Sequence, residues 1–296
     1  MPFLTGVLRP GVLAALSLLL AACRPTLPTP GLRELPPPPP RCTPAAGAQP
    51  LRPVVPEPGQ GTEPVARPQG TTAAAMGYFE RLPPGYAADT ARRYPLVIFL
   101  HGAFETGHYL AKLDGSAVPG VRQHDLTALI DPRRGGDTPF LVLYPQRCSY
   151  VPAPGELREF IDYAMAAYRV DPRRIYLVGH SAGAGTLWLA LPQLADRVAA
   201  AVSLSAVDVG ADLCPARDVP VWAFHGADDP AVPLAHSREL VRRINACSPP
   251  PRQPARLTVL ERAGHDIDTQ VLQAHPPAAP GGEETDVLRW LLQHTR

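Results

Sequence analysis

Short apolar runs alternate with helical patterns through the last three quarters of the chain. Mostly apolar runs of four or five residues, set between polar and turn residues, predict strands buried on both faces; they are 96–100, 140–144, 175–178, 200–204, 221–224 and 257–260. Between the second and third runs, apolar residues at 157, 160, 161, 164, 165 and 168 form one helical stripe. Further helices are expected directly after Ser181, over 237–246 and over 284–293.

This alternation predicts an α/β fold with a mostly parallel central sheet and helices on both faces. In such sheets, ligands bind beyond the carboxyl ends of the strands. The loops that leave each strand are therefore the place to look for chemistry.

The first 22 residues predict a signal peptide. Residues 11–20 carry no charge, follow Arg9 and precede Ala21-Ala22-Cys23. The apolar run is too short to span a bilayer comfortably, and the small residues after it are typical of a cleavage site. Ala21-Ala22-Cys23 resembles the bacterial lipobox, which implies lipidation of Cys23 by chains such as palmitate, export and anchoring to a membrane. A buried apolar helix with a chance cysteine is the alternative.

Residues 23–71 predict a disordered linker. Many of the chain's 39 prolines lie here, including the run Pro36 to Pro40, and large apolar residues are scarce. Such a segment buries too little surface to offset the entropy of ordering, and consecutive prolines favour an extended path. A ligand for a proline-recognising domain is an alternative to a simple tether. The catalytic domain is expected to cover 72–296, about as long as one sizeable α/β domain.

The charge balance weighs against nucleic-acid binding. The 296 residues contain 28 Lys and Arg against 27 Asp and Glu, for a net charge of +1. Binding to a phosphate backbone draws on an excess of cations. We therefore expect no nucleic-acid partner.

A candidate nucleophile follows the 175–178 run. Gly179-His180-Ser181-Ala182-Gly183 fits G-x-S-x-G between a predicted strand and a predicted helix, where a strained turn exposes the serine hydroxyl. The alternative is a glycine-rich turn whose serine only caps the next helix.

A serine needs a histidine to remove its proton and a carboxylate to orient that histidine. Asp228 and Asp229 follow the 221–224 run, and His265 follows the 257–260 run, which gives the chain order Ser, acid, His. Asp208 and His275 are second candidates. His101, His180 and His225 are expected to be structural residues that bond nearby backbone.

An acyl-transfer site also needs two backbone N–H donors for the oxyanion. We expect Ala182, directly after the serine, and Ala103, in the turn after the 96–100 run, with Phe104 as the next choice. Phe104 and Tyr150 are candidate walls of the substrate pocket. Little chain lies between the strands to build a large lid, which favours an open cleft.

The segments 94–102, 171–183 and 219–229 resemble the α/β-hydrolase superfamily. They most resemble the small secreted carboxylesterases, a group with feruloyl and acetyl esterases, polyhydroxybutyrate depolymerases and phospholipase/carboxylesterase-type proteins. The pattern H-G-x-x-D-x-x-V-P of these families implies Asp229 rather than Asp228 as the acid. Ala182 stands where G-x-S-M-G has methionine, so the subfamily is left open.

With Cys23 assigned to a lipid, four cysteines remain for an exported protein, which allows three pairings. We favour Cys214 with Cys247, which bracket Asp229, and Cys42 with Cys148. The sequence has no metal-ligand spacing, P-loop or dinucleotide fingerprint, so neither a metal nor a cofactor is expected.

Together these features predict a membrane-anchored serine esterase, on the periplasmic side or the cell surface, that cleaves small-molecule or polymer-borne esters. One alternative is a prolyl-oligopeptidase-like peptidase, which shares the catalytic domain but usually carries a large extra domain. The other is a non-catalytic surface binding lipoprotein on a hydrolase fold.

Overall fold

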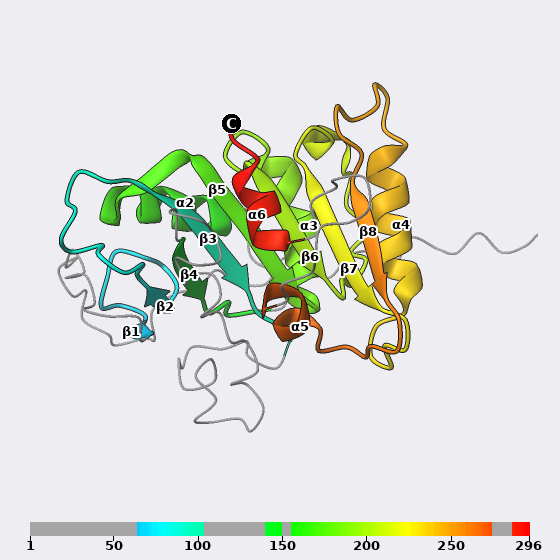
Figure 1. The fold of residues 1–296 in the computed structure, drawn as a ribbon, viewed down its shortest axis with the longest axis horizontal. Helices are drawn as coiled ribbons and strands as arrows, with labels where there is room; N and C mark the ends of the chain where they lie inside the picture. The colour runs from blue at the N-terminus through cyan, green and yellow to red at the C-terminus, as the bar shows by residue number, and fades with distance from the viewer. Residues whose placement is uncertain (1–63, 104–139, 150–154, 274–285) are drawn as a thin grey trace, which may run out of the picture. The chain divides into compact units, whose positions relative to one another are not determined.

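The computed structural model describes residues 64–103, 140–149, 155–273 and 286–296. These residues form an eight-stranded sheet of order β1-β2-β4-β3-β5-β6-β7-β8 (Figure 1). The strands are β1 Val65–Arg67, β2 Tyr78–Arg81, β3 Tyr94–Leu100, β4 Leu141–Pro145, β5 Val170–His180, β6 Ala200–Leu204, β7 Val221–Gly226 and β8 Arg256–Leu260. β1 pairs with β2, and β2 with β4, in antiparallel fashion, whereas every other pair is parallel. The expected mostly parallel sheet is confirmed.

The helices follow the strands as the apolar pattern predicted. They are α2 Glu156–Ala167, α3 Ala182–Leu194, α4 Leu234–Asn245, α5 Asp268–Gln273 and α6 Val287–Leu292, with a 3₁₀ turn η3 at Cys214–Ala216. The short β2 and α5 were not predicted, because polar residues interrupt both segments and neither contains a continuous apolar run.

Helices cover both faces of the sheet. Along β3, Leu96, Ile98 and Leu100 join one apolar cluster with residues of α2, α3 and α4. Val97 and Phe99 point the other way and join a second cluster with residues of α5 and α6. In Figure 1, α5 and α6 lie in front of the strands. This two-sided cover explains why the strands are apolar along their whole length.

The expected start of the folded domain at residue 72 differs from the structure. Val65–Arg67 already forms β1, with Val65 opposite Glu80 and Arg67 opposite Tyr78. The Arg67 guanidinium lies 2.7 Å from the carboxylate of Glu80, whose side chain is fully buried. This contact attaches a segment of linker-like composition to the sheet edge, and composition alone gives no sign of such a partner.

Several predictions fall outside the described residues. They are the signal peptide 1–22, most of the linker 23–71, Cys23, Cys42, Phe104, Tyr150 and His275. Among the described residues, none of the helices is long and apolar enough to cross a membrane.

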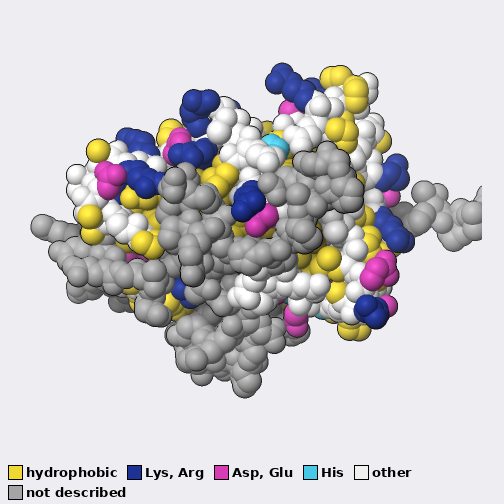
Figure 2. Space-filling model, in the orientation of Figure 1, with side chains coloured by type: hydrophobic (Ala, Val, Ile, Leu, Met, Phe, Trp, Pro, Cys, Tyr) yellow, Lys and Arg dark blue, Asp and Glu magenta, His cyan; other side chains and the backbone are white. Residues whose placement is uncertain are grey.

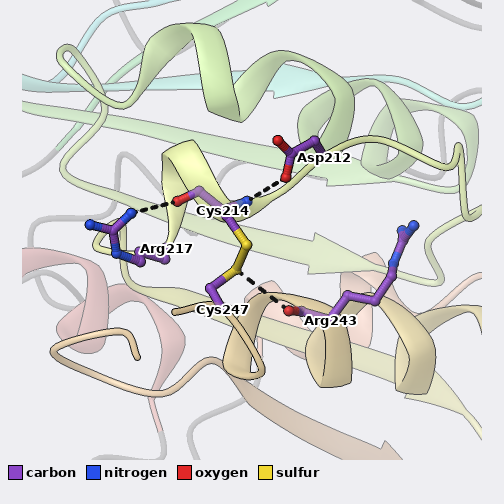
Figure 3. The surroundings of a disulfide bond; sticks show 5 residues. All are labelled: Asp212, Cys214, Arg217, Arg243 and Cys247. Atoms are coloured by element: carbon purple, nitrogen blue, oxygen red, sulfur yellow. Dashed lines mark hydrogen bonds between the residues drawn. A yellow bond between two sulfur atoms is a disulfide. The ribbon is translucent and has the colours of Figure 1, made fainter. Parts of the chain in front are cut away.

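One expected disulfide is present in the described part of the chain. Cys214 at the start of η3 bonds to Cys247 just after α4, and Figure 3 shows the bond between these two segments. The bond closes a loop of chain that contains β7 and Asp229. Cys148 is disulfide-bonded as well, and its expected partner, Cys42, is not among the described residues.

Charges of both signs are interspersed on the described surface that Figure 2 shows. Two exposed pairs are typical: Arg242 lies 2.6 Å from Glu239, and Arg158 lies 2.5 Å from Asp196. Exposed pairs of this kind contribute little to stability.

Candidate active site

Ser181 occupies a strained turn between β5 and α3. Its φ of 55° and ψ of −120° lie in a backbone region that side chains with a Cβ rarely adopt. Ser181 precedes the first residue of α3, yet its side chain makes no capping hydrogen bond. The helix-cap alternative for this serine is therefore wrong.

The two glycines of the motif allow the turn to pack closely. A Cβ on Gly179 would lie 2.6 Å from the carbonyl oxygen of Gly183. A Cβ on Gly183 would lie 2.0 Å from the carbonyl oxygen of Leu100, at the end of β3. No side chain fits at either position, so glycine is required for the start of α3 to touch the loop after β3.

Three side chains from three different loops meet at this turn. Nε2 of His265 lies 2.9 Å from Oγ of Ser181, and Nδ1 of His265 lies 2.7 Å from Oδ2 of Asp229. The Asp229 side chain is fully buried, whereas 18% of the His265 side chain is exposed. The loops after β5, β7 and β8 thus place the three predicted residues in one hydrogen-bonded chain.

Asp229 is held as a carboxylate by its surroundings. Its Oδ1 accepts hydrogen bonds of 2.8 Å from the backbone N–H groups of Ala231 and Val232. Burial by itself would raise the pKa of the Asp229 carboxyl, but the hydrogen bonds from His265, Val232 and Ala231 outweigh it and lower this pKa below its usual value. An ionised Asp229 requires His265 to carry its proton on Nδ1, which leaves Nε2 free to accept the serine proton.

The alternative acids lie elsewhere. The residue Asp228 is exposed, and its backbone N–H donates to the carbonyl of Ala263. Asp208 pairs with Arg243 at 2.6 Å. His275, the alternative base, lies outside the described residues. The geometry favours Asp229 over both other aspartates.

The loop that carries His265 is fixed through its main chain. The carbonyl of His265 accepts hydrogen bonds from Oγ of Ser205 at 2.9 Å and from Nε2 of His180 at 3.1 Å. A Cβ on Gly226 would lie 2.1 Å from the carbonyl oxygen of Gly264, so the loops after β7 and β8 are in direct contact. These contacts hold the histidine against the loop of its acid.

The three histidines expected to be structural do bond to backbone. Besides His180, they are His101, whose Nδ1 lies 2.7 Å from the carbonyl oxygen of Gly102, and His225, whose Nε2 lies 3.0 Å from that of Val232. Nε2 of His225 is also 3.2 Å from Oδ2 of Asp229. Burial lowers the pKa of His225, so the ring is neutral at pH 7.

The two candidate oxyanion donors belong to two segments of the chain that are in contact. Ala182 is the first residue of α3, where backbone N–H groups have no acceptor within the helix. Ala103 follows the end of β3 after two residues, and the contact between Gly183 and Leu100 brings its loop to the start of α3. Phe104, the second choice of donor, lies outside the described residues.

Within the described ranges, His, Cys, Asp and Glu side chains form no cluster that could hold a metal ion. The arrangement suits nucleophilic catalysis, since a serine hydroxyl, an imidazole and a carboxylate form one hydrogen-bonded chain. Sequence reasoning missed polar residues around this chain, because their partners lie 12 or more residues away: Ser205 bonds to the carbonyl of His265, Ser237 lies 2.7 Å from Nδ1 of His225, and Arg147 donates to Thr186.

Comparison with known proteins gives a consistent class. The phospholipase/carboxylesterase family matches residues 152–275, a segment that contains Ser181, Asp229 and His265. This match confirms the expected resemblance. No curated protein sequence matches the chain.

Solved structures share the fold. A thermostable esterase is 24% identical with a TM-score of 0.59, and the alignment covers 79% of this chain and 63% of that one. The chain thus spans less than two thirds of that esterase. A feruloyl esterase module from Clostridium thermocellum, complexed with sinapinate, is 18% identical with a TM-score of 0.56, covering 75% of this chain and 90% of that one. A ferulic acid esterase is 18% identical with a TM-score of 0.50, covering 67% and 89%.

The chain therefore has the α/β-hydrolase fold. Identities at this level show a shared architecture, and the family match adds support for an enzyme of the ester-hydrolysing type.

Proposed function

We propose that this protein is a serine hydrolase that cleaves carboxylic esters through Ser181, His265 and Asp229. The observation that carries the proposal is the continuous hydrogen-bonded chain from Oγ of Ser181 through His265 to Oδ2 of Asp229. The strained backbone of Ser181 adds support, because strain of this kind is stored at functional sites. The match to the phospholipase/carboxylesterase family favours esters over peptides as substrates.

In the proposed reaction, Oγ of Ser181 bonds to the ester carbonyl carbon while its proton passes to Nε2 of His265. Asp229 holds the other ring nitrogen and stabilises the imidazolium that forms. The backbone N–H groups of Ala103 and Ala182 would bind the oxyanion of the tetrahedral intermediate. The bond to the alcohol oxygen then breaks, and the alcohol leaves with the proton from His265.

Water completes the proposed cycle. His265 takes a proton from water while the water oxygen bonds to the acyl carbon. The bond between this carbon and Oγ of Ser181 then breaks, Oγ takes the proton back from His265, and the acid is released. Because only a neutral imidazole can accept a proton, activity should fall on acidification through the range in which histidines titrate.

The proposed substrates are small-molecule or polymer-borne esters. Phe104 and Tyr150 remain candidate walls of the pocket. Hydroxycinnamoyl esters belong in the test panel, because two of the structures with this fold are a feruloyl and a ferulic acid esterase.

The test is hydrolysis of p-nitrophenyl esters from acetate to palmitate, and of methyl ferulate, by the purified protein and its Ser181→Ala variant. Activity in the parent and its loss in the variant is the expected result. Equal activity in both proteins would rule out Ser181 as the nucleophile. If neither protein cleaves any ester, cleavage of proline-containing peptides would support the peptidase alternative, and failure there would support the binding-lipoprotein alternative.

We further propose that the protein is exported and anchored through a lipid on Cys23. The support is the uncharged run at 11–20 followed by Ala21-Ala22-Cys23. In a bacterial host fed radiolabelled palmitate, the full chain should take up label and sediment with membranes, and Cys23→Ala should do neither. Label that persists in Cys23→Ala would refute lipidation at this residue.

A further inference from the structure

A buried arginine lies beside the expected oxyanion site and is not part of the three-residue chain. Arg147 lies two residues after Pro145, the last residue of β4, and is 2% exposed. Removing a guanidinium from water costs several kcal/mol. Apolar residues that replace a buried ion pair often leave the fold equally stable or make it more stable. A buried cation next to a reaction site therefore calls for a functional explanation.

One side of the Arg147 guanidinium holds the loop after β3. Its Nη2 donates to the carbonyl of His101 and lies 3.4 Å from the carbonyl oxygen of Gly102. The backbone N–H of Arg147 donates to Nε2 of His101 at 2.9 Å. Nε2 is thus an acceptor, so the proton of this neutral ring is on Nδ1, which donates to the Gly102 carbonyl at 2.7 Å.

These contacts determine where the Ala103 N–H points. The carbonyl of Gly102 and the N–H of Ala103 belong to one peptide unit, which is planar and trans, so the two groups point in opposite directions. The ring of His101 and the guanidinium of Arg147 hold the carbonyl from one side. The N–H of Ala103 is thereby held facing the other way.

The other side of the guanidinium holds the helix of the nucleophile. Nη1 of Arg147 donates to Oγ1 of Thr186 at 2.6 Å, and Thr186 in turn donates to the carbonyl of Ala182 at 3.0 Å. Arg147 therefore connects the segments that carry the two expected oxyanion donors. A cation beside the Gly102 carbonyl also polarises that peptide unit and strengthens its N–H as a donor.

We propose that Arg147 is a positioning residue for the oxyanion hole, which it assembles by joining the Gly102–Ala103 peptide to the start of α3. This inference rests on the proposed ester hydrolysis. Arg147 touches no reacting atom, and it acts through the N–H groups of Ala103 and Ala182.

The test compares an ester with its thiono analogue, in which sulfur replaces the carbonyl oxygen. Sulfur is a weak hydrogen-bond acceptor, so the thionoester benefits little from the oxyanion hole. The substrates are p-nitrophenyl benzoate and p-nitrophenyl thionobenzoate, and the variants are Arg147→Met, Arg147→Lys and Thr186→Val. Arg174→Met is the matched control, because it also removes a guanidinium bound to a polar partner, here Asp171, but lies toward the opposite end of β5 from Ser181.

We expect Arg147→Met to lower kcat for the oxygen ester by about 10²-fold, the effect of losing one oxyanion donor. KM and the pH midpoint of activity should change little, and the rate ratio of oxygen ester to thionoester should fall by about tenfold or more. Arg147→Lys and Thr186→Val should give smaller falls of the same kind, and Arg174→Met should leave the ratio unchanged.

Each contrary outcome has its own meaning. Folded Arg147 variants that keep the parental ratio of the two rates, whether or not both rates fall, would overturn the positioning role. Ester hydrolysis by the protein would remain intact. If circular dichroism shows that Arg147→Met does not fold, the ratios of Arg147→Lys and Thr186→Val decide the question in the same way. A parent protein that cleaves neither ester would overturn the proposed function itself, and this inference with it.

Discussion

The two sides of the candidate site are held together by different means. On the proton-transfer side, which carries Asp229 and His265, the loops after β7 and β8 are joined mainly through their backbones: the N–H of Asp228 donates to the carbonyl of Ala263, and that of Ala227 donates to the carbonyl of Leu260, each at 3.0 Å. On the oxyanion side, the loop after β3 and the start of α3 are joined by the buried guanidinium of Arg147. Backbone hydrogen bonds between neighbouring loops join the segments of one side, whereas a buried guanidinium joins the segments of the other.

The difference follows from what each side has to position. Proton transfer needs three side-chain atoms within hydrogen-bond distance, and adjacent parallel strands already bring their loops to one edge of the sheet. An oxyanion hole needs two backbone N–H groups that point at one position. The N–H and the C=O of one peptide unit point in opposite directions, so a side-chain donor that binds the C=O also orients the N–H. A guanidinium has five N–H donors in a fixed fork, which lets one residue hold several acceptors.

The largest effect should come from the proton-transfer side. We expect His265→Ala to lower kcat by about 10⁵ to 10⁶-fold, because Ser181 loses its base. Steady-state kinetics on the best p-nitrophenyl ester would measure this loss. Adding Ser181→Ala to His265→Ala should cause almost no further loss, and a second large drop would show that the two residues do not act as one unit.

Asp229→Asn should follow, with a fall in kcat of about 10⁴-fold. The amide cannot act as a carboxylate for Nδ1 of His265, so the ring loses both its tautomer and the charge that stabilises its protonated form. Asp228→Asn is the matched control and should stay close to the parent, because this neighbouring side chain is not part of the hydrogen-bonded chain. Comparable losses in both variants would overturn the assignment of Asp229.

Removing the disulfide would show how much the stability of the side that carries Asp229 and His265 depends on a covalent link. Replacing Cys214 and Cys247 with serine should lower the free energy of unfolding by about 3 to 4 kcal/mol, because the bond closes a loop of 33 residues in the unfolded chain. Urea unfolding monitored by circular dichroism would measure the change. A stability equal to that of the parent would show that the bond contributes nothing to the fold around β7.

The smallest effect concerns the neutral histidine beside Asp229. Because burial lowers the folded-state pKa of His225, the unfolded chain binds a proton that the folded protein does not, and stability should fall as the pH drops below about 6.5. His294 shows the same direction for the same main cause. Each histidine contributes at most about 1.4 kcal/mol per pH unit.

Urea unfolding at pH 7 and at pH 5.5 would measure this loss, and His225→Gln and His294→Gln should each make it smaller. A pH dependence that stays unchanged in His225→Gln would contradict a buried neutral ring at this position. The Asp229 carboxyl, whose folded pKa is lowered, acts in a separate window: its contribution is present above the usual aspartate pKa and is lost only as the pH falls further.

The sheet and the hydrogen-bonded chain of Ser181, His265 and Asp229 could be predicted from sequence because their signals are local. Runs such as 96–100 are apolar on both faces and identify buried strands. The motif around Ser181 has a strand before it and a helix after it, and Asp229 and His265 each follow a strand in the required order. Each of these signals spans only a few residues.

The oxyanion side was predictable only in part. The donor role of Ala103 and Ala182 stays a prediction made from where strands end. Arg147 lies 46 residues from His101 and 39 from Thr186, and its Pro-Gln-Arg surroundings have no distinctive pattern. β1 was missed for the same reason, because Arg67 contacts the buried Glu80, a partner that the sequence around Arg67 does not indicate. Polar contacts between residues far apart in the sequence become visible only once the tertiary structure is known.

In the proposed mechanism, His265 and Asp229 activate Ser181 as a nucleophile. Labelling with a fluorophosphonate, followed by intact mass and peptide mapping, tests this directly, because the reagent reacts with activated serine hydroxyls and requires no knowledge of the substrate. We expect a single adduct on Ser181, which should form far more slowly in His265→Ala. An adduct on another residue, no adduct, or an equal rate in His265→Ala would contradict it.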